Sequence, residues 1–242
     1  MHALFSGQDC FLARQAWQKL LTANVVRADS TLTEVYTLTD RFWNHLARLP
    51  AILHRGHALR EARKHGLPIE AANVTLLERR AEKLRSEIAA LFDSYTALAP
   101  QPTEVPSSDP RSIYNTVLSY TNVWHGSFRM SCWASLLILQ AVLDECRWPP
   151  SADERYYTAA NRELARCICR SVECVGTGLL GPLRVGYPLR IAYEFVDLRT
   201  QLWIGSLLVK FEKRYASTAV NGYPKPGSSE LWASDGQHDG GT

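Results

Sequence analysis

The most regular pattern of apolar positions in the sequence is a seven-residue repeat between residues 68 and 98. Leucines recur at every seventh position, and apolar or small side chains fill the positions between them: Leu77, Leu84, Leu91 and Leu98, with Val74, Ala81, Ile88 and Tyr95. This spacing places one apolar stripe along a helix. Pro100 then stops the repeat, because proline fits poorly inside helices. The pattern therefore predicts one long amphipathic helix.

The stripe on this helix has two interpretations. It either packs inside its own domain or forms the seam of a dimeric coiled coil. Internal packing is favoured because the repeat lasts only about four heptads. Under the dimer interpretation, Leu77, Leu84 and Leu91 are the partner-binding residues.

Proline-rich segments separate this helix from the others. Three helices are predicted between Asp9 and His65, with breaks near residues 28–30 and at Pro50. A linker rich in proline and serine is predicted over residues 99–109. Residues 112–146 are apolar on most faces, which predicts a buried central helix beginning near Ser112.

The C-terminal third of the chain carries two more helical patterns and a polar end. A helix is predicted from an N-cap at Ser151 to about Cys174. Pro188 fits the first turn of a last helix that extends to about Tyr215. Residues 217–242 are rich in glycine, serine and proline and lack periodicity, which predicts a disordered tail.

These segments predict an all-α fold. We expect a single multi-helix domain of packed helical hairpins over residues 1–216, followed by the tail over residues 217–242. Strand-like alternation of apolar and polar residues lasts only a few positions wherever it occurs. A chain of 242 residues is long enough to bury such a core without disulfides or metals.

Charge and composition narrow the classes of partner. The net charge of +3 is far below the basic excess of a free-standing nucleic-acid-binding domain, so direct binding of nucleic acid is not expected. The sequence starts with no signal-peptide pattern, and the longest apolar run, residues 134–143, is too short to cross a bilayer. A soluble intracellular protein without membrane contact, with its six cysteines as thiols, is predicted.

Residues that could ligate a metal do not occur at suitable spacings. Cys167, Cys169 and Cys174 form a C-x-C-x4-C pattern without the second ligand pair of a structural zinc site. His54 and His57 could meet on one helical face, but two histidines alone do not complete a site. The simpler interpretations are that the cysteines are small core residues and that the two histidines lie on a surface face of a helix. No metal is therefore predicted.

Catalytic and cofactor motifs are also lacking in the sequence. Residues 176–181 have the form G-x-G-x-x-G, but a predicted helix rather than a strand precedes them, so a helix–helix loop is expected in place of a dinucleotide site. The basic residues 55–64 precede the heptads as in a basic leucine zipper, but Gly66 and Pro68 interrupt the continuous helix that such a protein needs. The sequence thus predicts neither an enzyme nor a bound cofactor.

The order of several motifs along the chain resembles a known family. A proline-containing motif at residues 46–53 precedes the long charged helix, an aromatic stretch at 114–120 follows it, and then come the segments 163–173 and 186–192. The strongest elements are Ile168 to Ser171 and Pro188 to Ala192. This series is similar to the helical regulatory region of fungal Zn2Cys6-type transcription factors, over about residues 41–215.

The resemblance implies a fungal regulator of transcription that acts in the nucleus through protein–protein contacts, often for genes of secondary metabolism. Its partner would be a second copy of the chain or a DNA-binding regulator. The six-cysteine zinc cluster that reads DNA in this family is absent from the sequence, so that activity is not carried over to any residue. A helical adaptor or dimerisation module without a transcriptional role is the alternative, and an enzyme with a site assembled from scattered helices is a third.

Overall fold

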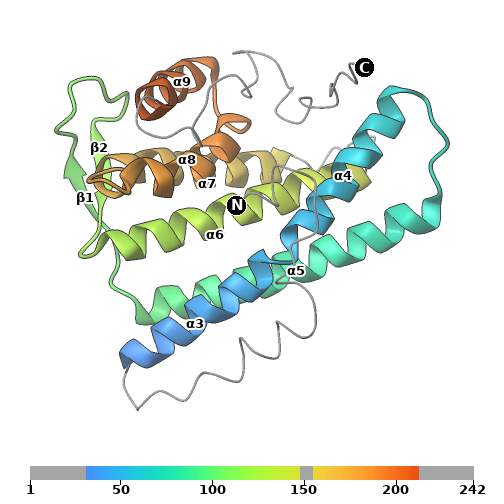
Figure 1. Cartoon of the computed structure of the whole chain (residues 1–242), viewed down its shortest axis with the longest axis horizontal. Helices are drawn as coiled ribbons and strands as arrows, with labels where there is room; N and C mark the ends of the chain where they lie inside the picture. Colours follow the sequence, from blue (N-terminus) through green and yellow to red (C-terminus); the bar gives the residue numbers. More distant parts are fainter. Residues whose placement is uncertain (1–30, 148–154, 213–242) are drawn as a thin grey trace, which may run out of the picture.

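The structure, a computed structural model, describes residues 31–147 and 155–212, and most of these residues lie in α-helices (Figure 1). The elements in chain order are α3 (Thr31–Leu46), α4 (Leu49–Lys64), α5 (Ala71–Leu98), β1 (Thr103–Pro106), β2 (Thr116–Ser119), α6 (Val123–Cys146), α7 (Arg155–Val175), α8 (Gly181–Tyr193) and α9 (Leu198–Glu212). The predicted all-α fold of packed helices is confirmed. The predicted tail over residues 217–242 lies outside the described residues.

The central element is α6, with α3 and α5 on one side and α7 and α8 on the other (Figure 1). Asn122 begins the helix, since its side-chain oxygen accepts a hydrogen bond from the Trp124 amide at 2.9 Å. Residues of α6 are buried on nearly every face, which confirms it as the core helix. By length and composition it could cross a membrane, but 78% of its apolar window is buried inside the fold, and a core helix passes the same test.

The heptad stripe of α5 packs into this core. The buried residues of α5 follow the heptad at alternating spacings of four and three: Leu77, Ala81, Leu84, Ile88, Leu91 and Tyr95. Ring contacts join α5 to α6, with Phe92 and Trp133 5.9 Å apart and Tyr95 and Phe128 4.2 Å apart between ring centroids. The favoured interpretation of the stripe, internal packing, therefore describes this fold.

The predicted start of the central helix is wrong. The helix begins at Val123 rather than near Ser112, and β2 occupies part of the intervening segment. Its partner β1 lies in the stretch predicted as a linker, and the two strands pair antiparallel with Thr103 opposite Ser119. Val117 and Leu118 are buried in the strand, as they would be in a helix, so their apolar character alone does not distinguish the two structures.

Arg170 of α7 holds the short β-hairpin in place. Its Nε donates to the Thr116 carbonyl at 3.0 Å, and one terminal nitrogen donates to the Thr116 hydroxyl at 2.9 Å. The same guanidinium forms a 2.8 Å ion pair with Glu104. A buried arginine that satisfies strand backbone in this way stabilises strands too short to persist alone.

The predicted last helix is in fact two helices. Pro182, not Pro188, occupies the first turn of α8, and Pro188 lies inside that helix. The chain then turns at residues 194–197 and α9 begins. Asp197 caps α9, because its carboxylate accepts hydrogen bonds from the amide and the hydroxyl of Thr200 at 2.9 and 3.3 Å.

The junction of α3 and α4 differs from the prediction in one detail. α3 and α4 meet at Ala47 and Arg48, and Pro50 lies in the first turn of α4 instead of marking the break. Proline suits that position because the first amides of a helix have no intrahelical partner. The first of the three predicted helices, the break near residues 28–30 and the proposed cap at Ser151 lie outside the described residues.

Candidate functional site

The loop between β1 and β2 is fixed to α7 by one carboxylate, Glu173. The Ser107 hydroxyl and the Ser108 amide each donate to it at 2.7 Å, and the Ser108 hydroxyl donates at 2.5 Å. Further along the loop, Asp109 accepts hydrogen bonds from the backbone and the guanidinium of Arg111. These hydrogen bonds therefore give the loop a defined conformation and a fixed position against α7.

This anchoring predicts a pH-dependent loosening of the hairpin. Burial alone would raise the pKa of Glu173, but hydrogen bonds from Ser108 and Ser107 outweigh it and lower the pKa below the ordinary value of 4.5. The carboxylate thus stabilises the fold above that value, and the contribution is lost as the pH falls below it. We expect Glu173→Gln to lower hydrogen-exchange protection of residues 103–119 about tenfold at pH 7, since hydrogen bonds to a charged group contribute about 1.5–3 kcal/mol.

The matched control for this experiment is Glu163→Gln, an exposed carboxylate on the same helix that pairs with Arg166. It should leave protection of the hairpin unchanged. The difference in protection between Glu173→Gln and the unchanged protein should shrink as the pH falls through the lowered pKa of Glu173. Equal protection at pH 7 would contradict the anchoring role.

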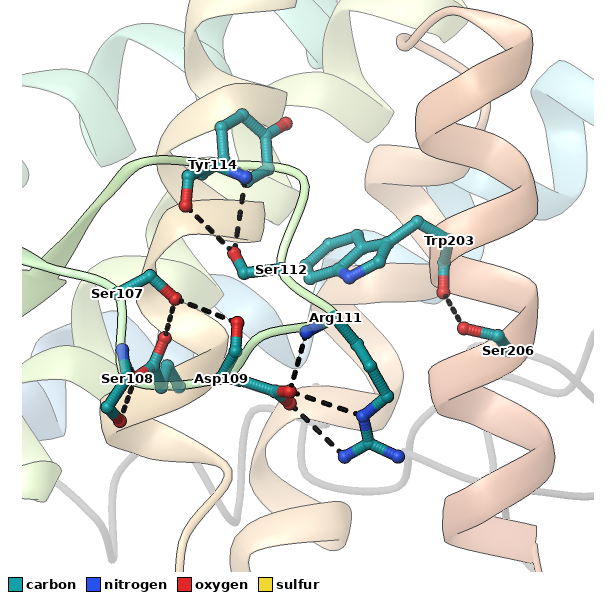
Figure 2. A network of polar contacts seen from close by, with 9 residues as sticks. Ser107, Ser108, Asp109, Arg111, Ser112, Tyr114, Trp203 and Ser206 are labelled. Atoms are coloured by element: carbon teal, nitrogen blue, oxygen red, sulfur yellow. Dashed lines mark hydrogen bonds and ion pairs between the residues drawn. The ribbon is translucent and has the colours of Figure 1, made fainter.

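Beyond the anchor, the loop places Tyr114 between α7 and α9. The Ser112 hydroxyl accepts from the Tyr114 amide at 3.2 Å, and the Tyr114 ring meets the Trp203 ring edge-on, with centroids 5.8 Å apart (Figure 2). Burial raises the pKa of the Tyr114 hydroxyl, and its hydrogen bond with Cys169 adds to the effect. Tyr114 is therefore a neutral side chain that joins the hairpin to two helices.

A cleft of about 780 Å³ opens beside Tyr114. Its walls come from the hairpin loop, the end of α6, α7, the α8–α9 connection and the first turn of α9. The lining comprises Ile113, Tyr114, Asp144, Asn161, Arg162, Arg166, Glu194, Phe195, Val196, Asp197, Arg199 and Thr200. Ligand sites in proteins commonly have volumes of about 300–1,000 Å³, so this cleft has the size of one, and most of its lining residues are polar or charged.

The charged groups of the cleft divide into paired and unpaired ones. Arg166 forms an ion pair with Glu163 at 2.8 Å, and Asp144 accepts from the Gln140 amide at 2.7 Å. Asp197 is occupied in capping α9. Within residues 31–147 and 155–212, no carboxylate pairs with Arg162 or Arg199, and both are exposed.

A second surface feature lies on α9. Thr200, Ile204 and Leu208 face the core, whereas an apolar stripe on the opposite side is exposed to solvent. We call it the α9 stripe; it consists of Leu198, Leu202 and Val209. Their spacing of four and seven residues aligns them along one helical face, and single exposed leucines are common whereas aligned ones mark contact surfaces.

The residues predicted as partner-binding lie elsewhere. Leu77, Leu84 and Leu91 are all buried on the core-facing side of α5, at 4%, 0% and 7% exposure. A partner could reach them only if α5 separated from the helices that cover it. Their partner-binding role remains a prediction, which a substitution at Leu84 tests.

The other residues considered for chemistry are scattered. Cys169 is buried, and burial raises its pKa to about 12 and that of Cys167 to about 11, so both thiols stay protonated near neutral pH. His54 is exposed on α4 and His57 is half-buried. In the part of the chain that the structure describes, no group of three or more potential ligands could hold a metal ion.

The G-x-G-x-x-G segment is a helix–helix loop, as predicted. α7 ends at Val175 and α8 begins at Gly181. Gly178 has a φ of +71°, a conformation that favours glycine, and a Cβ on Gly181 would lie 2.0 Å from the Gly176 carbonyl oxygen. These glycines therefore permit a tight turn between two helices, and no strand precedes them as a dinucleotide site requires.

One buried cation was not identified from the sequence. Arg129 of α6 is 3% exposed and lies over the rings of Phe92 and Tyr95, 5.8 and 5.5 Å from their centroids. It donates to the Pro100 carbonyl at 3.3 Å and so fixes the end of α5. Its contacts connect parts of the core, which indicates a structural role.

Comparison with known proteins finds no matching family model, no similar curated protein and no similar solved structure. The resemblance to the regulatory regions of fungal transcription factors therefore depends on the sequence motifs alone. The described geometry contributes two independent features to the question of function, the α9 stripe and the cleft beside Tyr114.

Proposed function

We propose that this protein is a transcription regulator-like helical module that acts in the nucleus through protein–protein contacts, with the α9 stripe as its docking surface. The observation that carries the proposal is the exposure of three aligned apolar side chains, with Leu202 at 56%. An amphipathic helix laid along another apolar surface is a recurring mode of recognition. The opposite face of α9 packs into the core, so the surface is held rigidly.

The charges beside the α9 stripe favour an acidic partner helix. Arg199 and Lys210 are eleven residues apart, about three turns, and so lie on the same flank of the stripe. Both are exposed, and neither forms an ion pair with a described residue. Two cations on one flank attract and orient a partner helix that carries carboxylates beside its apolar face.

The transcriptional part of the proposal is supported by the motif resemblance, whose best segments are Ile168 to Ser171 and Pro188 to Ala192. Both segments are largely buried, one in α7 and one in α8, and α8 packs against α9, the helix that carries the stripe. They would form the scaffold that presents α9. Regulation of genes of secondary metabolism is the role that this resemblance favours, and an adaptor without a transcriptional role would use the same surface.

A reporter assay tests the proposal. The full chain is fused to a heterologous DNA-binding domain, and reporter output is compared for the unchanged protein, Leu202→Asp and Leu76→Asp. Leu202→Asp should weaken partner binding at least about tenfold, because an unpaired carboxylate in an apolar contact costs more than about 1.4 kcal/mol. Leu76 is an exposed leucine on α5, outside the α9 stripe, so Leu76→Asp should keep the reporter response.

A photo-crosslinking residue at position 202, used in intact cells, separates the alternatives. Crosslinking to a partner together with a reporter response that Leu202→Asp removes supports the proposal. Crosslinking without any reporter response identifies an adaptor instead. A response that Leu202→Asp leaves unchanged would show that α9 is not the docking surface.

A further inference from the structure

The last residues of the sequence have the chemistry that the α9 stripe would bind. Residues 217–242 lie outside the described residues, and their charged side chains, histidine apart, are three carboxylates and one lysine: Glu230, Asp235, Asp239 and Lys225. The only leucine and the only tryptophan of this segment are neighbours, Leu231 and Trp232, and they stand between Glu230 and Asp235. Residues 230–235 therefore combine large apolar side chains with flanking negative charge.

The α9 stripe presents the complementary features. Its three apolar side chains, Leu198, Leu202 and Val209, are exposed on one face of the helix. Arg199 and Lys210 flank this face, and neither forms an ion pair with a described residue. Tryptophan is among the side chains that contribute most to contact surfaces, and cations beside an apolar surface attract and orient carboxylates. The stripe thus fits residues 230–235 in both polarity and charge.

The length of the connection permits this contact within one chain. Seventeen residues, 213–229, join the end of α9 to Glu230. The helical rise of about 1.5 Å per residue places Leu202 about 15 Å from the end of α9. A chain of 17 residues without regular structure, the form predicted for most of this connection, has an average end-to-end distance of about 20–25 Å. Because this distance is close to the span to be crossed, the effective concentration of residues 230–235 at the stripe is about millimolar, and a weak contact is sufficient.

We infer that residues 230–235 bind the α9 stripe of their own chain and compete there with the partner. The inference rests on the proposed function, because it concerns the regulation of the same docking surface. In this contact Leu231 and Trp232 cover the apolar side chains, and the flanking carboxylates face Arg199 and Lys210. The partner binds only the chains in which the stripe is uncovered, so its apparent affinity is reduced by their fraction.

A photo-crosslinking residue at position 202 of the purified full chain tests the contact without any partner. Irradiation of a dilute sample should link position 202 to residues 230–235 of the same chain, as mass spectrometry of the digested monomer would show. Trp232→Ala should lower the yield of this product several-fold, since truncation of a tryptophan anchor commonly weakens a contact about tenfold or more. The matched control is Tyr223→Ala, which removes another aromatic ring from the same segment and should leave the yield unchanged. A crosslinking residue at position 76, which is exposed on α5, should give no link to residues 230–235.

The possible outcomes separate this inference from the proposed function. Absence of the link from position 202, a link to a second copy of the chain instead, or equal yields from Trp232→Ala and Tyr223→Ala would overturn the inference. In the reporter assay Trp232→Ala should raise the response, whereas Leu202→Asp should remove it. A response that Leu202→Asp removes and Trp232→Ala leaves unchanged would support the docking surface and overturn its regulation by residues 230–235. The link in the purified chain together with no reporter response would support the inference and contradict the transcriptional proposal.

Discussion

Leu84→Asp should lower the free energy of unfolding by more than about 4 kcal/mol, among the largest effects of a single substitution. Leu84 is fully buried on the face of α5 that packs into the core. An aspartate at this position would place a carboxylate in apolar surroundings without a partner, and it would also leave a cavity. Urea unfolding of the purified full chain, followed by circular dichroism, measures the loss.

The matched control for Leu84→Asp is Leu76→Asp, on the exposed face of the same helix. Leu76 is 43% exposed, so the change should alter stability by only about 0.5 kcal/mol. Sedimentation of all three proteins decides between the two interpretations of the heptad stripe. A dimeric unchanged protein that becomes a folded monomer in Leu84→Asp would identify Leu77, Leu84 and Leu91 as a dimer seam.

Gly126→Ala should destabilise the protein by about 1–3 kcal/mol, although alanine is the better helix former. A Cβ at Gly126 would lie 2.4 Å from Cγ2 of Val175 and 2.7 Å from the ring of Tyr120. Neither neighbour can move easily. Val175 is fully buried at the end of α7, and the Tyr120 hydroxyl is hydrogen-bonded to Ser171 at 2.7 Å.

Gly205→Ala should change the free energy of unfolding in the opposite direction. Gly205 lies in α9, and a Cβ there meets no atom within 4 Å. The substitution should therefore stabilise the protein by up to about 1 kcal/mol, the difference in helix propensity between the two residues. Midpoints of urea unfolding measure both variants. A gain in stability for Gly126→Ala would show that α6 and α7 are not as closely packed as described.

The spacing of apolar residues predicts a helix of this fold correctly where the same period continues over many residues. The heptads of α5 repeat over the whole helix, so its existence and end are predicted within a few residues. The segment before α6 has no such period. Val117, Leu118 and Tyr120 are buried in a short strand and the turn after it, where apolar residues are as suitable as in a helix. The strands could not be predicted from their own residues, because the contacts that hold them come from Arg170 on α7, more than fifty residues further along the chain.

The cleft likewise could not be predicted from the sequence. Its lining residues come from segments that are far apart in the sequence, from Ile113 to Thr200. No local motif connects Asn161 with Arg199, and neither residue differs from an ordinary surface residue in its own segment. Asp197 is the exception, since an aspartate three residues before Thr200 is a usual helix cap and could have divided the predicted last helix.

The order of the helices has a consequence for the protein while it is being made on the ribosome. α5 is complete at Leu98, but α6, which covers its apolar stripe, ends only at Cys146. At a synthesis rate of about 5–20 residues per second, roughly 2–10 s separate the two events. During this interval only α3 and α4 are available to cover the row of leucines, and the face that α6 later covers stays exposed, the kind of segment that chaperones bind.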